Sequence, residues 1–231
     1  MRAVDRLCEH TYLPNLLNAG STVFDFGANH GKFSHGMISR YGCRVWAAEP
    51  VSELRAGIEP SPALTLLPFA VGAAKERAKV NIFGSRCASL LRRDGDEVLY
   101  GEQETDVLDL RSIFELSGLD RVDLMKVDIE GSEIGMFDSA KNEDLRRCTQ
   151  ITVEFHDFLY PEQAPQVEAI KRRLHSLGFW VINFSLDNTD VLFLNAATSG
   201  TGWLQYCRLK YLAKYTRGIA RRLGKWRVSL G

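Results

Sequence analysis

The sequence predicts a doubly wound α/β domain, and three observations support this. Short apolar runs end in glycine or acidic residues and alternate with helical patterns along most of the chain. Residues 23–31 have the order strand, tight glycine turn and helix start, and residues 122–133 repeat that order with charged residues at the strand end. A central strand of a parallel sheet is apolar on both faces, as these runs are. In such folds ligands bind where the carboxyl ends of the strands meet.

Length and composition are consistent with one soluble domain. A chain of 231 residues fits a single α/β domain with small additions, and 45% hydrophobic and 25% charged residues allow a substantial core. The five cysteines are scattered and none has C-x-x-C spacing, which indicates free thiols in a reducing compartment. No signal pattern and no apolar run of membrane-spanning length is present, so we expect a cytoplasmic protein.

Charge and pattern divide the chain into three parts. Residues 1–20 contain an amphipathic stretch, 7–17, that we predict to be a helix packed on the sheet edge, and residues 21–194 form the main domain. Residues 195–231 hold eight Lys/Arg and no Asp/Glu, whereas the remainder holds 21 basic and 29 acidic residues. A helix predicted over 204–223 would place this basic tail on an anionic membrane, on its own domain or on an oligomer partner. No recognition motif accompanies the charge, so nucleic acid is not expected.

The first strand, 23–26, runs into a turn with two glycines separated by three residues, and a helix over 32–41 follows. A dinucleotide fingerprint would be G-x-G-x-x-G, so this spacing argues against a nicotinamide cofactor. Glycines let the backbone approach a ligand, and the helix start directs free N–H groups toward it. The alternative is a βα turn that needs glycine for its conformation alone.

The second strand, 44–48, ends at Glu49, which lies 24 positions after Asp25. In nucleotide-binding α/β folds, a carboxylate that lies about 20 residues after the glycine turn binds the ribose hydroxyls. The alternative is a solvated acid before a proline turn. A third strand, 64–71, would leave the backbone of Ala70 and Val71 beside the base of a nucleotide, and residues 79–91 predict a small β insertion after it.

The fourth strand, 122–127, continues into a run of charges. Lys126, Asp128 and Glu130 fall on one side of the strand at period two. Because unpaired buried charge is costly, such a run indicates either a functional site or an internal ion-pair cluster. The fifth strand, 150–155, also ends with ionisable groups, Glu154 and His156. A helix over 161–178 and an antiparallel strand pair, 179–184 and 190–194, close the domain.

Together these residues resemble the FkbM family of S-adenosylmethionine (SAM)-dependent methyltransferases, over residues 21–194. The resemblance rests on D-F-G-A-N-H-G at 25–31, E-P at 49–50, A-V-G at 70–72, K-V-D-I-E-G-S-E at 126–133 and V-E-F-H at 153–156. It implies the Rossmann-like class I methyltransferase fold, a mostly parallel seven-stranded sheet with its last strand antiparallel. It also implies methylation of hydroxyl groups on sugars, glycans or natural products.

Site residues follow from this resemblance. The implied cofactor-binding set, in which the acid of the turn lies near the cationic amino group of SAM, is Asp25, Gly27, Ala28, Asn29, Gly31, Glu49, Ala70 and Val71. The implied catalytic set is Lys126, Asp128, Glu130 and His156. His156 is the first candidate general base, because imidazole titrates near neutral pH, and Asp128 is the alternative.

A metal ion is a further option. The carboxylates of Asp128, Glu130 and Glu154 suit Mg²⁺, which would orient a sugar hydroxyl and lower its pKa. Two other classes stay open at this point: a nucleotide- or NAD-binding oxidoreductase, and a non-catalytic SAM-binding subunit.

Overall fold

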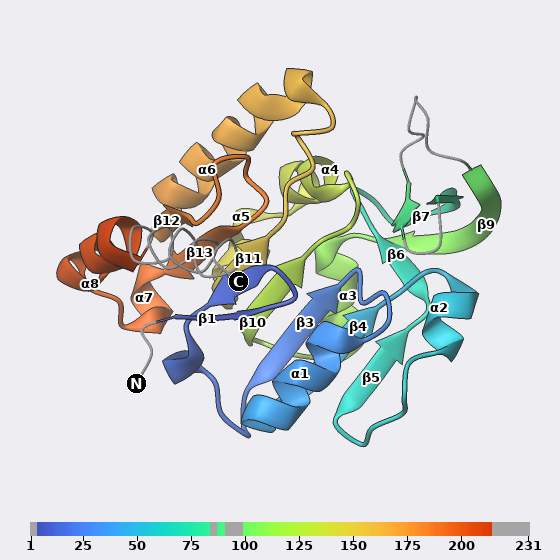
Figure 1. Ribbon diagram of the computed structural model, residues 1–231, viewed down its shortest axis with the longest axis horizontal. Helices are drawn as coiled ribbons and strands as arrows, with labels where there is room; N and C mark the ends of the chain where they lie inside the picture. The colour runs from blue at the N-terminus through green and yellow to red at the C-terminus, as the bar shows by residue number, and fades with distance from the viewer. Residues whose placement is uncertain (1–3, 84–86, 91–98, 214–231) are drawn as a thin grey trace, which may run out of the picture.

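The computed structural model describes residues 4–83, 87–90 and 99–213 and is built around a seven-stranded sheet (Figure 1). In spatial order the strands are β12 (Phe179–Asn183), β13 (Val191–Asn195), β11 (Cys148–Val153), β10 (Val122–Val127), β3 (Thr22–Phe26), β4 (Arg44–Ala48) and β5 (Leu64–Leu67). The strands β11, β10, β3, β4 and β5 are parallel, while β13 runs antiparallel to both of its neighbours. The predicted doubly wound sheet with an antiparallel last strand is confirmed.

Helices cover both faces of this sheet. They are α1 (Lys32–Tyr41), α2 (Ser52–Ala56), α3 (Leu110–Ser117), α4 (Glu133–Ser139), α5 (Asn142–Arg146) and α6 (Ala164–Ser176), with η2 (Pro161–Gln163) before α6. Successive residues of β3 point to opposite faces, so Phe24 and Phe26 pack in the cluster that contains α3, α4 and α6. Val23 packs in the cluster that contains Phe33 and Met37 of α1. This two-faced burial explains why the strand is apolar throughout.

A second, four-stranded sheet has the order β6 (Phe69–Val71), β9 (Leu99–Leu108), β7 (Glu76–Phe83) and β8 (Cys87–Ser89). It confirms the predicted β insertion after the third strand. The single strand predicted over 64–71 is wrong, because β5 ends before Pro68 and β6 begins after it in the other sheet. Proline has no N–H to donate to a ladder, so the chain leaves the main sheet there.

The N-terminal segment is a hairpin, so the helix predicted over 7–17 is wrong. β1 (Asp5–Leu7) and β2 (His10–Tyr12) pair antiparallel, and only a short 3₁₀ turn, η1 (Pro14–Leu16), follows. The two turn residues, Cys8 and Glu9, have φ of +45° and +68°. The Asp190 carboxylate accepts from both the N–H (3.0 Å) and the hydroxyl (2.7 Å) of Thr11. This docking, and not helical spacing, decides the local structure.

The first part of the predicted basic tail packs on the domain. It forms α7 (Ala196–Ser199), α8 (Trp203–Cys207) and a π-helical turn, η3 (Arg208–Ala213). The Tyr206 ring stacks on Trp180 of β12 with centroids 4.6 Å apart, and Leu209 is buried beside them. The rest of the predicted amphipathic helix, from residue 214, lies outside the described residues. Within the described ranges, no helix has both the length and the apolar character to cross a membrane.

Candidate functional site

The strand order reverses between β3 and β10, and the loops that follow these two strands touch. Gly27 has φ +78°, and a Cβ there would lie 1.8 Å from the carbonyl oxygen of Asp128. Only glycine therefore allows the two loops to meet. Asn29 (φ +50°) and Gly31 (φ +71°) complete the turn, and Gly31 directly precedes α1. A crevice at such a reversal is where ligands bind in doubly wound folds.

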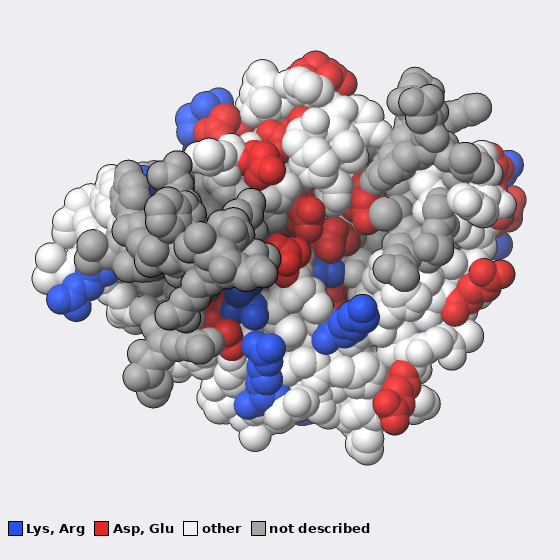
Figure 2. All heavy atoms as spheres, viewed as in Figure 1, with Lys and Arg blue, Asp and Glu red and all other residues white. Residues whose placement is uncertain are grey.

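A pocket that is open to solvent lies at this crevice. Its lining includes both loops, the end of β4 and the second sheet, and consists of Gly27, Asn29, Ala48, Glu49, Pro50, Leu54, Phe69, Ala70, Val71, Val80, Leu90, Asp128, Ile129 and Glu130. Acidic side chains gather in a hollow near the centre of the face shown in Figure 2. The pocket is thus apolar on the side of the second sheet and polar toward β10.

Glu49 is fixed at the edge of this pocket by backbone groups. Its Oε2 accepts from the N–H of Asn29 at 2.8 Å, and its Oε1 accepts from the N–H of Val51 at 2.9 Å. The residue is 3% exposed. Burial raises the pKa of Glu49, and the two amide hydrogen bonds oppose that rise. Each oxygen keeps a second lone pair for a ligand hydroxyl.

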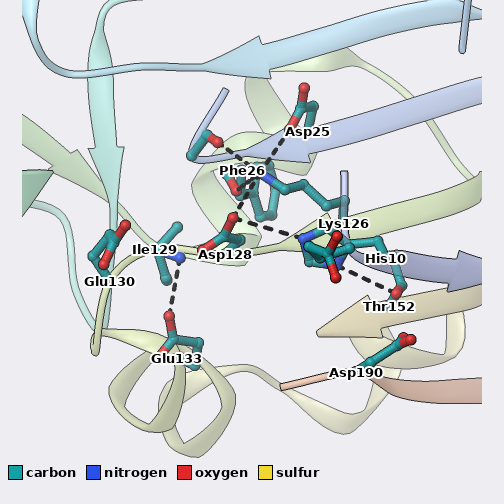
Figure 3. Close-up of polar contacts among 12 residues, drawn as sticks. His10, Asp25, Phe26, Lys126, Asp128, Ile129, Glu130, Glu133, Thr152 and Asp190 are labelled. Atoms are coloured by element: carbon teal, nitrogen blue, oxygen red, sulfur yellow. Dashed lines mark hydrogen bonds and ion pairs between the residues drawn. The ribbon is translucent and has the colours of Figure 1, made fainter. Parts of the chain in front are cut away.

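Lys126 lies between the glycine turn and Asp128 and connects the two loops (Figure 3). Its Nζ donates to the carbonyl oxygens of Gly27 (2.6 Å) and Phe26 (3.3 Å) and lies 3.2 Å from Asp25 Oδ1 and 3.4 Å from Asp128 Oδ2. Burial alone would lower the pKa of Lys126, but these two carboxylates raise it. Lys126 therefore stays charged and holds the glycine turn in place, and it does not line the pocket.

Asp25 is also held away from the pocket. The residue is fully buried, and its Oδ2 accepts from the hydroxyl of Ser34 at 2.6 Å while Oδ1 faces Lys126. Of the predicted cofactor set, the turn residues Gly27 and Asn29, together with Glu49, Ala70 and Val71, line the pocket. Three members, Asp25, Ala28 and Gly31, do not.

The loop after β10 is shaped by Glu133, a residue that the sequence reasoning left out of the site. Its Oε1 accepts from the N–H groups of Ile129 (2.9 Å) and Gly131 (3.1 Å), and the residue is 1% exposed. These bonds hold Glu130 at φ +55°, a conformation uncommon outside glycine. The signal in the sequence was the acid in the first turn of a helix, where a carboxylate binds free N–H groups.

His156 lies between two carboxylates. Its Nδ1 is 3.0 Å from Glu133 Oε1, and its Nε2 is 3.3 Å from Glu130 Oε2. Burial would lower the pKa of His156, but the hydrogen bonds and charges of Glu130 and Glu133 outweigh burial and raise it to about 11. The imidazole is therefore protonated at neutral pH and has no free site for another proton. This arrangement is unfavourable to the predicted role of His156 as general base.

Asp128 lies at the centre of the acidic cluster, with a side chain 27% exposed. Burial would raise its pKa, but the charges of Lys126 and of protonated His156 help to hold the pKa of Asp128 well below its usual range. His10 of the N-terminal hairpin places Nε2 3.6 Å from Asp128 Oδ2. Nothing in the local sequence signals this contact, because 118 positions separate the two residues. Burial and the charge of Asp128 raise the pKa of Glu154 to about 7.

The predicted metal-ligand set does not come together as one group. Among the described residues, ligand atoms within 4.8 Å of one another form two sets that share Asp128. One set adds His10 and Glu154, and the other adds Glu130 and His156. The carboxylates of Glu130 and Glu154 thus belong to different sets, each of which contains a histidine.

Distant structural similarities include several methyltransferases. A putative methyltransferase from an antibiotic biosynthesis pathway of Anabaena variabilis is 12% identical with a TM-score of 0.34, covering 75% of this chain and 64% of its own. Haemonchus contortus phosphoethanolamine N-methyltransferase 2, in complex with SAM, is 10% identical with a TM-score of 0.36, covering 71% and 34%. A TehB-like SAM-dependent methyltransferase from Corynebacterium glutamicum is 14% identical with a TM-score of 0.37, covering 76% and 80%. The chain spans less than two thirds of the length of the Anabaena and Haemonchus proteins. All three similarities are too distant to assign a substrate.

Sequence comparison gives a closer assignment. No curated protein sequence matches this chain. The Methyltransferase FkbM domain matches residues 25–181, which is more than half of the chain and spans both loops of the pocket. The chain therefore belongs to the FkbM family of methyltransferases.

Proposed function

We propose that this chain binds SAM in the pocket between the glycine turn and the loop after β10, and methylates a hydroxyl group of a sugar, glycan or small natural product. The observation that carries the proposal is the position of Glu49, fixed by two backbone amides at the edge of a pocket that Asp128 lines on its other side. One carboxylate is thereby available to a nucleoside and the other to an acceptor.

The cofactor half of the pocket suits an adenosyl group. The free lone pairs of Glu49 can accept from two vicinal ribose hydroxyls, and Leu54, Phe69 and Val71 provide apolar surface for a base. Bound there, SAM supplies a methyl group that its positive sulfur already activates. The protein then has to align the acceptor oxygen with that methyl group and receive a proton.

Asp128 is the residue that we assign to the acceptor. It accepts a hydrogen bond from the acceptor hydroxyl and orients the oxygen toward the methyl group. When the oxygen gains the methyl group it becomes positively charged, and its proton is then acidic enough to pass to a carboxylate of low pKa. His156, already protonated, instead holds the negative loop residues Glu130 and Glu133 in place.

The setting of the reaction is also part of the proposal. Near the end of the described chain, Trp203, Leu204 and Tyr211 are 63%, 80% and 55% exposed, and Lys210 lies beside Tyr211. Apolar and basic groups together suit the interface of an anionic membrane. We propose a cytoplasmic protein that contacts such a membrane peripherally, where glycan or lipid-linked acceptors occur.

Calorimetry on matched variants tests the cofactor assignment. Glu49→Ala is expected to weaken SAM binding by about 1–3 kcal/mol, since it removes charge-assisted hydrogen bonds. Glu53→Ala, on the exposed side of α2, is the control and should bind as wild type. Titration with NAD separates the methyltransferase from the oxidoreductase class, and binding of NAD but not SAM would overturn the proposal.

Activity measurements test the acceptor assignment. With labelled SAM and glycan or lipid extracts, Asp128→Asn is expected to lower methyl transfer by about 10² or more while SAM still binds. Asp138→Asn, an exposed residue of α4, is the control. Full activity of the Asp128 variant would remove Asp128 from the mechanism, and SAM binding without any transfer in wild type would favour a non-catalytic subunit.

A further inference from the structure

His10 occupies a fixed position next to the acceptor side of the pocket. The hairpin that carries it is anchored at two residues that closely follow His10. Thr11 bonds to Asp190, and Leu13 exchanges backbone hydrogen bonds with the Gln150 side chain, donating its N–H at 2.9 Å and accepting at 3.3 Å. The His10 ring is completely buried and contacts Phe33 edge-on, with centroids 5.8 Å apart. Its position is therefore imposed by the fold and is not a matter of side-chain freedom.

The two ring nitrogens of His10 have different surroundings. Nδ1 lies 3.4 Å from the hydroxyl oxygen of Thr152 (Figure 3). In the part of the chain that the structure describes, Nε2 has no hydrogen-bond partner although it is buried. It points at Asp128, whose Oδ2 lies 3.6 Å away, a distance too long for a hydrogen bond. In the tautomer that donates Nδ1–H to Thr152, Nε2 presents a lone pair to the Asp128 carboxylate.

Glu154 completes a convergent set of ligand atoms. His10, Asp128 and Glu154 each offer one such atom, and the three lie within 4.8 Å of one another. In the tautomer with the proton on Nδ1, and with both carboxylates ionised, all three atoms are acceptors, and a cation among them is favoured. Lys126 serves only in part: its ammonium lies 3.4 Å from Asp128 Oδ2 but is shared with Asp25 and with the carbonyl oxygens of the glycine turn.

We propose that His10, Asp128 and Glu154 bind a divalent transition-metal ion such as Mn²⁺ or Zn²⁺. Two ligands about 2.1 Å from one ion at a tetrahedral angle are about 3.4 Å apart, close to the 3.6 Å between His10 and Asp128. One imidazole nitrogen with two carboxylate oxygens suits such ions better than Mg²⁺, which prefers oxygen ligands alone. Thr152, next to Nδ1, would fix the ring so that Nε2 faces the metal ion.

The surrounding charge favours a cation at this position. The cluster has two positive groups, Lys126 and His156. Its carboxylates are more numerous: Asp25, Asp128, Glu130, Glu133 and Glu154. The ion would lie beside Asp128, and there it would polarise an acceptor hydroxyl. That role rests on the proposed function, whereas metal binding itself does not.

Metal binding by the full chain tests the site directly. After treatment with EDTA and its removal, the protein is dialysed against Mn²⁺ or Zn²⁺ and analysed for bound metal, with the electron paramagnetic resonance of Mn²⁺ as a second readout. We expect one ion per chain, and binding stronger than that of Mg²⁺. His10→Ala and Glu154→Gln are expected to lose it, and Thr152→Val to weaken it by about 10- to 100-fold.

The control variant is His175→Ala, an exposed histidine of α6 that should leave metal binding unchanged. Circular dichroism confirms folding, and if His10→Ala fails to fold, Glu154→Gln and Thr152→Val carry the test. Absence of stoichiometric binding, or equal binding in the site variants, would overturn the inference. SAM titration on the EDTA-treated chain keeps the two proposals separate: SAM binding without metal binding refutes the metal site alone, and metal binding without SAM binding refutes the proposed function alone.

Discussion

Replacing Lys126 with methionine is expected to destabilise the fold strongly. The residue is 3% exposed, and its ammonium contacts two carboxylates and two carbonyl oxygens. Methionine keeps much of the side-chain volume but removes the charge. Asp25, which is fully buried, would then lack its counter-charge, and the glycine turn would lose the donor that fixes it.

The magnitude follows from what is left unpaired. Removing one partner of a buried ion pair costs about 3–5 kcal/mol, because the remaining charge stays buried without compensation. A domain of this kind is stable by about 5–15 kcal/mol, so the variant would lose a large share of its stability. Adding Asp25→Asn removes the orphaned charge, and the double variant is expected to be more stable than Lys126→Met alone.

Urea unfolding followed by tryptophan fluorescence measures these differences. Lys79→Met is the control, because the Lys79 ammonium pairs with Glu102 at an exposed position. This substitution should shift the urea midpoint of unfolding little. A loss below about 1 kcal/mol in Lys126→Met would refute the reasoning, because an interaction of that size is typical of surface pairs. A double variant less stable than the single one would refute the assignment of Asp25 as the orphaned group.

Three further outcomes are expected. Gly27→Ala should lower the melting temperature and abolish SAM binding in calorimetry, because its Cβ would lie 1.8 Å from the Asp128 carbonyl oxygen and separate the two loops; wild-type affinity would contradict this. The folded pKa of His156 is raised to about 11 from 6.5, so the stability that wild type gains over His156→Gln should be full below pH 6.5 and decline as pH rises toward 11. Urea unfolding from pH 6 to 9 checks the decline, and a constant difference would exclude it. Trp203→Ala with Leu204→Ala should reduce co-sedimentation with anionic vesicles at low salt, and equal sedimentation would remove the membrane contact.

The sequence predicts the central sheet well, because the residues that this sheet requires can be recognised within each short segment. A strand buried on both faces must be apolar, and a loop that touches another loop at Gly27 must have glycine. The pairing of Asp25 with Lys126 was missed, although both residues were singled out. They are direct neighbours across β3 and β10, and this register depends on strand order, which the separate patterns do not contain.

The N-terminal hairpin could not be predicted from its own residues. Apolar spacing over 7–17 fits a helix, but the segment is held as a strand by Asp190 and Gln150, far along the chain. The same long-range contacts place His10 beside the site, and no residue near it in the sequence indicates this. The break at Pro68 was readable, by contrast, since proline in a strand interior argues against a continuous strand.

Docking of this hairpin also sets the order in which the site can form. Thr11 can bond to Asp190 only after Asp190 has been synthesised, 179 residues later. At a synthesis rate of about 5–20 residues per second, that interval is roughly 10–40 s. During this time the hairpin lacks the anchor at Asp190, and a two-stranded hairpin alone is marginal in water. His10 is therefore made well before the carboxylate that anchors the next residue, so we expect the acceptor side of the pocket to be completed only after Asp190 is in place.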